Sequence, residues 1–181
     1  MPFNLTDQTI VYITRDIERA AVHVLAPGQT RERDLSVLDW PLVAGLSDDG
    51  RLLLVHESGE GTGVTPTFFL RRTDGSPSVK LVSGSPRGKL SRDGRWAAIV
   101  DRDDRLMIVP TRAGESREIR TDRLTRHWIT DWSPDNKRFL FSGLGQDKKR
   151  LLYRCTLETG AVEPFSKELI LGAWYTPDGK R

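Results

Sequence analysis

One short pattern recurs along the chain, and its clearest copy reads Asp131-Trp132-Ser133-Pro134-Asp135-Asn136-Lys137-Arg138-Phe139-Leu140-Phe141. A hydroxyl residue, a proline or polar residue and an Asp-Gly or Asp-Asn pair make a tight turn. They do so because Asp bonds its own backbone, while Gly or Asn accepts a positive φ. A cation and a short apolar run follow, which is typical of a buried strand. Each copy therefore predicts two antiparallel strands joined by a hairpin.

Further copies lie on both sides of this one, and their spacing is even. Their hydroxyl residues lie 41 to 44 positions apart, at Thr6, Ser47, Ser91, Ser133 and Thr176. The residues that we predict to build the turns are Ser47, Asp49, Gly50, Ser91, Asp93, Gly94, Ser133, Asp135, Asn136, Asp178 and Gly179. The copy around Thr6 is short and degenerate, and the last copy stops with the chain at Arg181. Even spacing of this kind indicates a repeated structural unit.

A second turn recurs between two further strand-like segments of each repeat, at Pro27-Gly28, Asp74-Gly75, Ala113-Gly114 and Thr159-Gly160. Every repeat therefore holds about four strands, and four strands in about 40–45 residues are typical of a β-propeller blade. We predict an all-β propeller with about four four-stranded blades, as one module over residues 1–181. The approximate repeats are residues 1–36, 37–83, 84–121 and 122–167, with a partial repeat at 168–181.

Composition limits the classes of function that the chain can have. The 181 residues carry a formal net charge of +3, too small to predict a dedicated phosphate-binding surface, so we expect no nucleic-acid partner. No apolar stretch approaches the ~20 residues of a membrane span, and the first residues lack the pattern of an export signal. We therefore expect no membrane segment in this chain, and the compartment, bacterial periplasm or cytoplasm, stays open. A single cysteine, Cys155, excludes an internal disulfide.

The repeated Ser-Pro-Asp-Gly-Lys type of turn resembles the TolB-like, or PD40, class of WD40-like propeller repeats, and this resemblance covers nearly the whole chain. A narrower resemblance is to the propeller that follows bacterial serine/threonine kinases. It is carried by Thr14–Arg19, Leu25–Ser36 and Leu70–Pro77. The kinase resemblance implies a sensing or protein-interaction domain, commonly separated from the kinase by a membrane span. These motifs are specific to the fold and not to an activity.

Two features depart from the kinase-linked arrangement. The chain has no kinase segment, and it ends inside its last turn motif. Propellers of this class usually have six or more blades, so we favour a fragment of a larger ring. The alternative is a small closed ring in which Leu169–Trp174 supplies the inner strand of the first blade. An open arc leaves blade edges that can pair with a second copy, so we expect self-association in the fragment case.

Candidate chemistry is sparse, and we predict a non-catalytic module without cofactor or metal. The turn aspartates occur once per repeat and do not converge as an acid/base pair. Asp101-Arg102-Asp103-Asp104 has arginines beside its carboxylates and no calcium-loop spacing. The three histidines, His23, His56 and His127, fall at unrelated phases of the repeat, and Cys155 lies in an apolar strand where we expect it to be packed.

The expected role is therefore binding, with a protein or peptide as the partner and a small ligand as the second class. Glu60, Gly61 and Thr62 lie in a glycine-rich stretch that we predict to be an interaction loop. The basic clusters Arg123–Arg126 and Asp147–Arg150 are interpreted as solvated surface, because acids interrupt them and aromatic residues are not interleaved. We expect the tryptophans to pack between blades: Trp40, Trp96, Trp128, Trp132 and Trp174.

Two rival functions involve segments outside this sequence. One is a propeller that gates a prolyl-oligopeptidase-like serine hydrolase, which a downstream Gly-x-Ser-x-Gly in the same reading frame would favour. The other is a free-standing TolB-like envelope protein that docks a lipoprotein, which an export signal upstream would favour. An upstream His-Arg-Asp motif and membrane span would instead favour the kinase-linked protein.

Overall fold

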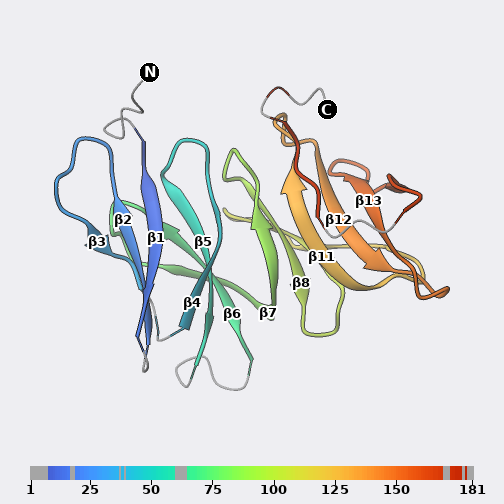
Figure 1. Ribbon diagram of the computed structural model, residues 1–181, viewed down its shortest axis with the longest axis horizontal. Helices are drawn as coiled ribbons and strands as arrows, with labels where there is room; N and C mark the ends of the chain where they lie inside the picture. Colours follow the sequence, from blue (N-terminus) through green and yellow to red (C-terminus); the bar gives the residue numbers. More distant parts are fainter. Residues whose placement is uncertain are drawn as a thin grey trace. The chain divides into compact units, whose positions relative to one another are not determined.

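The computed structural model describes residues 8–16, 19–36, 38, 40–59, 65–168, 172–176 and 178. Within these residues the chain forms β-strands joined by turns, and no α-helix (Figure 1). Every pair of neighbouring strands is antiparallel, so the predicted all-β class is confirmed. The chain divides into two compact units, Met1–Ser83 and Gly84–Arg181.

The first unit holds one three-stranded sheet and one set of four paired strands. The three-stranded sheet has the order β1 (Ile10–Arg15), β2 (Ala20–Leu25), β3 (Arg33–Asp34). The second set has the order β4 (Trp40–Leu46), β5 (Leu52–Ser58), β6 (Thr67–Arg72) and the first part of β7 (Val79–Leu90). In this unit β7 pairs with β6 through residues such as Val79 and Ser83.

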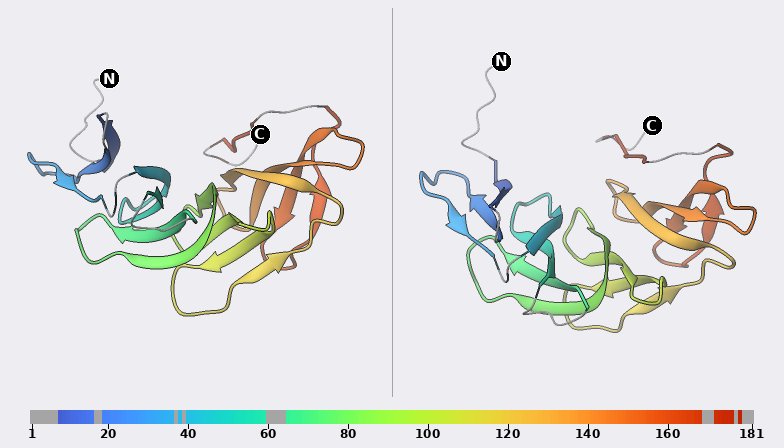
Figure 2. Two further views of the ribbon diagram at one scale, coloured as in Figure 1. Left: turned by 90° about the horizontal axis from the view of Figure 1, so that it is seen from below. Right: turned by 60° about the horizontal axis from the view of Figure 1, so that its bottom comes forward.

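The second unit holds two sets of four strands. The rest of β7, from Gly84, pairs with β8, so β7 ends one set of four strands and begins the next. The first set continues with β8 (Trp96–Asp101), β9 (Leu106–Pro110) and β10 (Arg117–Ile119). The second set is the sheet β11 (Thr125–Trp132), β12 (Arg138–Leu144), β13 (Arg150–Thr156), β14 (Val162–Pro164), drawn in orange to red in Figure 2. The repeat boundaries given above remain predictions.

The strand that follows each of the Ser47, Ser91 and Ser133 turns is the most buried of its set. β8 is buried at every position from Ala97 to Asp101, and β12 is buried from Phe139 to Gly143. A strand with both faces covered needs a continuous apolar run rather than an alternating pattern, which explains sequences such as Trp-Ala-Ala-Ile-Val. The apolar run that follows each of these three turns therefore marks an inner strand. β1, which follows the degenerate first copy, lies instead at the edge of its sheet and is half-buried to exposed.

In the first unit, apolar side chains from the two neighbouring sheets form one core. The cluster joins side chains of β2, β5 and the residue after β3: Val22, Val24, Leu35, Leu53 and Val55. Val11, Val43 and Leu46 pack against it and are partly buried. The faces of adjacent repeats are therefore held together by β-branched residues and leucines, which lose little rotamer freedom on a pleated surface.

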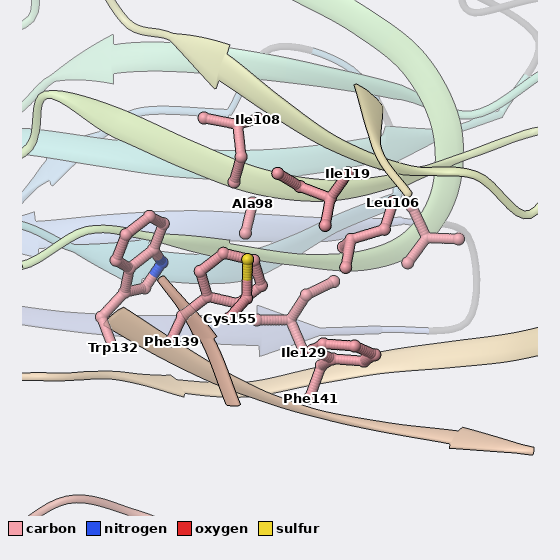
Figure 3. Close-up of a cluster of buried hydrophobic side chains, with 10 residues drawn as sticks. Ala98, Leu106, Ile108, Ile119, Ile129, Trp132, Phe139, Phe141 and Cys155 are labelled. Carbon is pink, nitrogen blue, oxygen red and sulfur yellow. The ribbon is translucent and has the colours of Figure 1, made fainter. Parts of the chain in front are cut away.

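The second unit has a larger core with more aromatic residues. Side chains of β8, β9 and β10 point toward those of β11, β12 and β13, and the two groups meet face to face (Figure 3). Trp132 is only 1% exposed; its ring centroid lies 5.0 Å from that of Phe139, and its indole N–H donates to the Lys89 carbonyl at 3.1 Å. The apolar ring of this tryptophan is therefore packed in the core, and its one polar atom has a hydrogen-bond partner.

Contacts between residues one repeat apart recur in both units. In the first unit, Arg33 Nη1 donates to the Thr73 carbonyl at 3.4 Å. In the second, Arg117 Nη1 donates to the Glu158 carbonyl at 3.3 Å, and Asp93 N donates to Asn136 Oδ1 at 3.1 Å. These pairs are separated by 40, 41 and 43 residues. Corresponding turns of successive repeats therefore lie side by side within each unit.

The prediction that the tryptophans pack between blades is correct for Trp132 and wrong for Trp128 and Trp174, which are 52% and 74% exposed. Trp128 lies between the buried His127 and Ile129, so alternation along β11 turns its side chain to the opposite face. Trp174 precedes its hydroxyl residue, Thr176, by one position more than Trp132 precedes Ser133. Tyr175 therefore occupies the position that corresponds to Trp132.

Two substitutions of the same chemistry test this distinction. Trp132→Ala removes a filled core position, and we expect it to lower the free energy of unfolding by about 3–5 kcal/mol. Trp128→Ala removes an exposed ring, and we expect a change within about 0.5 kcal/mol. Urea denaturation followed by far-ultraviolet circular dichroism measures both values. Similar losses for the two variants would contradict the assignment of Trp132 to the core.

Candidate functional site

The hydroxyl and carboxylate side chains of the repeat turns form the same small network in each described copy. Ser133 Oγ donates to Asp135 Oδ1 at 2.6 Å and accepts from Arg138 N at 2.9 Å, while Asp135 Oδ1 accepts from Lys137 N at 3.0 Å. Asn136 takes a φ of 57° and donates its N–H to the Ser133 carbonyl at 2.9 Å. The network satisfies the backbone donors of the turn and fixes the register of the hairpin.

The other copies repeat these contacts. Ser47 bonds Asp49, and Ser91 bonds Asp93, at 2.6 Å in each case, with Gly50 and Gly94 at φ values of 69° and 70°. In the last copy, Thr176 Oγ1 donates to Asp178 Oδ1 at 2.6 Å. Each carboxylate is thus engaged with its own turn, one turn per repeat. Gly179 and the predicted interaction loop of Glu60, Gly61 and Thr62 lie outside the described residues.

A different group of side chains surrounds a pocket of about 530 Å³ in the second unit. Three of its five lining residues are arginines, and one of the others is an exposed tryptophan. They come from β7, β11, β12 and β13 and are Arg87, Arg126, Trp128, Ser142 and Arg150. Residues far apart in sequence thus meet in one place. We call this site the arginine–tryptophan pocket.

An irregularity in β11 shapes the pocket. The pairing of β11 with β12 shifts register between Thr125 and Trp128, and Arg126 within this bulge has a φ of 51°. The Arg126 N–H donates to the Asp104 carboxylate, which lies in the turn between β8 and β9. A bulge redirects the side chains next to it. Arg126 and Trp128 are exposed on either side of the buried His127.

Two of the arginines are fixed by hydrogen bonds to backbone carbonyls of this bulge. Arg87 Nη1 donates to the His127 carbonyl at 2.9 Å, and Arg87 Nε donates to Ser85 Oγ at 2.6 Å. Arg150 Nη1 donates to the Arg126 carbonyl at 2.9 Å and to Ser142 Oγ at 3.0 Å. The two guanidinium groups are therefore held in place, while the Arg126 side chain is exposed.

The pocket is electropositive. Asp104 pairs with Arg87 at 3.2 Å and is the one acidic group paired with a pocket arginine among the described residues. Burial lowers the pKa of His127, which outweighs the opposite effect of the Asp104 carbonyl and carboxylate. His127 is therefore neutral near pH 7. Its Nδ1 donates to the Asp104 carbonyl at 2.8 Å, and its Nε2 accepts from Thr121 Oγ1 at 3.0 Å.

This arrangement can bind anions, but it does not supply acid–base chemistry. Guanidinium groups stay protonated and only donate hydrogen bonds, and His127, which could titrate, is 2% exposed with both ring nitrogens engaged. Among the described residues no group of three or more His, Cys, Asp or Glu side chains could hold a metal ion. Asp101 accepts from the N–H groups of Asp103 and Arg105, both at 2.9 Å, so its role is to close a hairpin.

The sequence contained these residues but not their arrangement. Arg126 and Arg150 belong to the two basic clusters interpreted as solvated surface, and the structure brings both to one pocket. Arg126 is exposed, in agreement with that interpretation, whereas Arg150 is half-buried and donates to the Arg126 carbonyl and to Ser142 Oγ. Arg87 comes from another repeat, so no local motif could have joined it to them. The one available signal in the sequence was that Arg123–Arg126 interrupts the apolar pattern expected of a strand, which indicates an irregular backbone there.

No family model matches the sequence, and no curated protein matches it. Solved structures do match its fold. TolB from Acinetobacter baumannii has a TM-score of 0.72 and 14% identity, covering 97% of this chain and 46% of that one. A protein assigned as TolB from Agrobacterium tumefaciens has a TM-score of 0.66 and 21% identity, covering 91% and 61%. Oligogalacturonate lyase from Vibrio parahaemolyticus has a TM-score of 0.59 and 16% identity, covering 96% and 51%.

These comparisons show the fold: the chain consists of β-propeller blades like those of TolB, as predicted. It spans about half the length of the TolB chains that it resembles. Identities this low carry no activity from one protein to another, and the neighbours include an enzyme. No helix in the part of the chain that the structure describes is long and apolar enough to cross a membrane.

The turn network predicts a pH-dependent stability. The Ser133 hydroxyl, and next the Lys137 N–H, lower the pKa of Asp135 below its ordinary value. A carboxylate with a lowered pKa stabilises the folded state above about pH 4, and this contribution is lost as pH falls through the folded pKa. We expect Ser133→Ala to cost about 1–2 kcal/mol at neutral pH and less at about pH 3.

Chemical denaturation at the two pH values measures this difference. Ser116→Ala, at an exposed serine without a hydrogen bond among the described residues, is the matched control and should change stability little at either pH. A loss for Ser133→Ala that does not shrink in acid would argue against the hydroxyl–carboxylate bond.

Cys155 gives a second prediction. It is fully buried, and burial raises its pKa to about 12. The thiolate is the reactive form, so the folded protein should react negligibly with a chromogenic disulfide reagent at about pH 8. The same protein unfolded in urea should react completely, because an exposed cysteine has a pKa near ~8.5. Stoichiometric reaction of the folded protein would contradict the packed position.

Proposed function

We propose that this chain is a non-catalytic β-propeller module that binds a protein or peptide partner through the arginine–tryptophan pocket. The observation that carries the proposal is the contrast between the turns and this pocket. The carboxylates of the described turns bond their own backbone, as at Asp49, Asp93 and Asp135. The pocket instead keeps an exposed aromatic ring beside guanidinium groups with donors to spare.

Binding fits these residues better than catalysis does. A reaction centre needs a group that takes or gives a proton, a nucleophile or a metal, brought together at one place. Arginine and tryptophan supply none of these, but both are enriched at the central residues of protein interfaces. Asp104, the one acidic group paired with a pocket arginine in the described residues, is bound by Arg87 and by the Arg126 backbone.

We further propose that the module belongs to a longer protein, kinase-linked or TolB-like, in which it is the sensing or interaction part. One finding and one resemblance read from the sequence support this proposal. The chain spans about half of the TolB chains that share its fold. The segments Thr14–Arg19, Leu25–Ser36 and Leu70–Pro77 resemble kinase-linked propellers. The residues that line the arginine–tryptophan pocket lie on strands β7, β11, β12 and β13 of this module.

Site-specific photo-crosslinking in the cells that produce the protein tests the binding role. A benzophenone amino acid replaces Trp128 in one variant and Glu115, an exposed residue of the β9–β10 hairpin, in the other. Both positions are in the second unit and both accept an exposed ring. We expect a discrete crosslinked species from position 128 and none of that mass from position 115. No species from position 128, or the same species from both positions, would contradict the proposal.

A further inference from the structure

We infer that the arginine–tryptophan pocket binds an acidic segment of the partner, in which carboxylates contact the arginines and an apolar side chain packs on Trp128. The inference rests on the proposed function and specifies the chemistry of the segment that the pocket recognises.

The lining of the pocket carries an excess of positive charge. Arg87, Arg126 and Arg150 line the pocket, and among the described residues Asp104 is the one carboxylate paired with any of them. Its second oxygen accepts from the Arg126 backbone N–H, so Asp104 does not neutralise the Arg126 side chain. His127 is neutral and buried beneath this surface. The pocket therefore keeps an excess of positive charge that an anionic group would balance.

The pocket also presents hydrogen-bond donors that have no acceptor among the described residues. Within the described residues, Arg87 Nη2 and both Nε and Nη2 of Arg150 have no acceptor, and the Arg126 guanidinium has none at any nitrogen. These donors come from planar groups that match the two oxygens of a carboxylate. The carbonyls of Arg126 and His127 already hold Arg150 and Arg87 in position. Binding would therefore cost these two side chains little conformational entropy.

The side chains that line the pocket, and its volume, favour an acidic peptide over other anions. A sugar acid presents several hydroxyl groups that need acceptors, but the lining offers one neutral polar side chain, Ser142, which is 2% exposed and already bonded to Arg150. A single-stranded nucleic acid stacks successive bases on several aromatic rings, and this lining has one. A pocket of about 530 Å³ suits a few side chains of a peptide.

Peptide binding at low ionic strength tests the inference. The probe is a blocked, fluorescein-labelled pentapeptide with four glutamates around a central phenylalanine, and its match has glutamine at all four positions. Fluorescence anisotropy with the full chain measures both dissociation constants. We expect the glutamine peptide to bind about tenfold more weakly or worse, as loss of charge-assisted hydrogen bonds implies. Equal affinity for the two peptides would overturn the inference.

Two arginine variants separate the pocket from general attraction to a basic protein. Arg126→Gln removes a guanidinium without a partner among the described residues, so folding should be unaffected. Arg112→Gln removes the same charge from an exposed position on the β9–β10 hairpin. We expect Arg126→Gln to weaken binding of the acidic peptide about tenfold, and Arg112→Gln less than about twofold, because salt screens distant charges. Equal weakening by both variants would overturn the inference.

Competition with unlabelled oligothymidylate completes the experiment. If oligothymidylate displaces the labelled peptide at a lower concentration than the unlabelled acidic peptide does, the inference is overturned in favour of a nucleic-acid strand. If oligothymidylate needs a higher concentration than the unlabelled peptide, the inference is supported. Failure of this inference can be distinguished from failure of the proposed function. A crosslink at position 128 without charge-dependent peptide binding refutes the acidic segment alone, whereas loss of the position-128 crosslink refutes the partner site itself.

Discussion

The hydrogen bond from a serine or threonine hydroxyl to the carboxylate two residues later sets the geometry of each turn that the structure describes. In the Ser133 turn the same hydroxyl accepts from the N–H of Arg138, so a single side chain fixes both the turn and the first pair of the hairpin. Register in a hairpin decides which face every later side chain takes, since a slip of one residue inverts the pattern. Burial of Phe139 and Phe141 on one face of β12 therefore depends on the turn that precedes them.

Successive repeats pack together because hydrogen-bond donors and acceptors about one repeat apart in the sequence lie opposite each other. Trp132 reaches the Lys89 carbonyl across 43 residues, and the Tyr175 N–H reaches Asp131 Oδ2 across 44. Polar bonds of this kind lie at the ends of strands, while buried apolar side chains of one cluster, Ile108 and Ile129 among them, fill the space between sheets. Directional bonds and non-directional burial thus specify the same stacking within each unit.

The sequence was sufficient to predict the features that repeat. Ser47, Ser91 and Ser133 mark the turns, and the apolar runs after them mark the central strands, because turn chemistry and burial act over a few neighbouring residues. The arginine–tryptophan pocket could not be predicted in the same way, since Arg87, Arg126 and Arg150 are joined by strand pairing and not by spacing. The prediction that Trp128 is buried was wrong for a related reason. A large aromatic side chain favours burial, but the position of Trp128 on β11 points its ring outward.

The backbone beside the pocket is irregular. Asp104 and Arg126 both have positive φ without being glycine, and the bond between the Arg126 N–H and the Asp104 carboxylate joins the two irregular positions. Backbone in this region is unfavourable for such residues and persists when surrounding contacts hold it. Arg87 and Arg150 supply those contacts by bonding the carbonyls that the bulge exposes. Arg87 and Arg150 thus stabilise the bulge and also contribute to the positive charge of the pocket, so a substitution of either arginine would disturb the strand together with the anion binding that we propose.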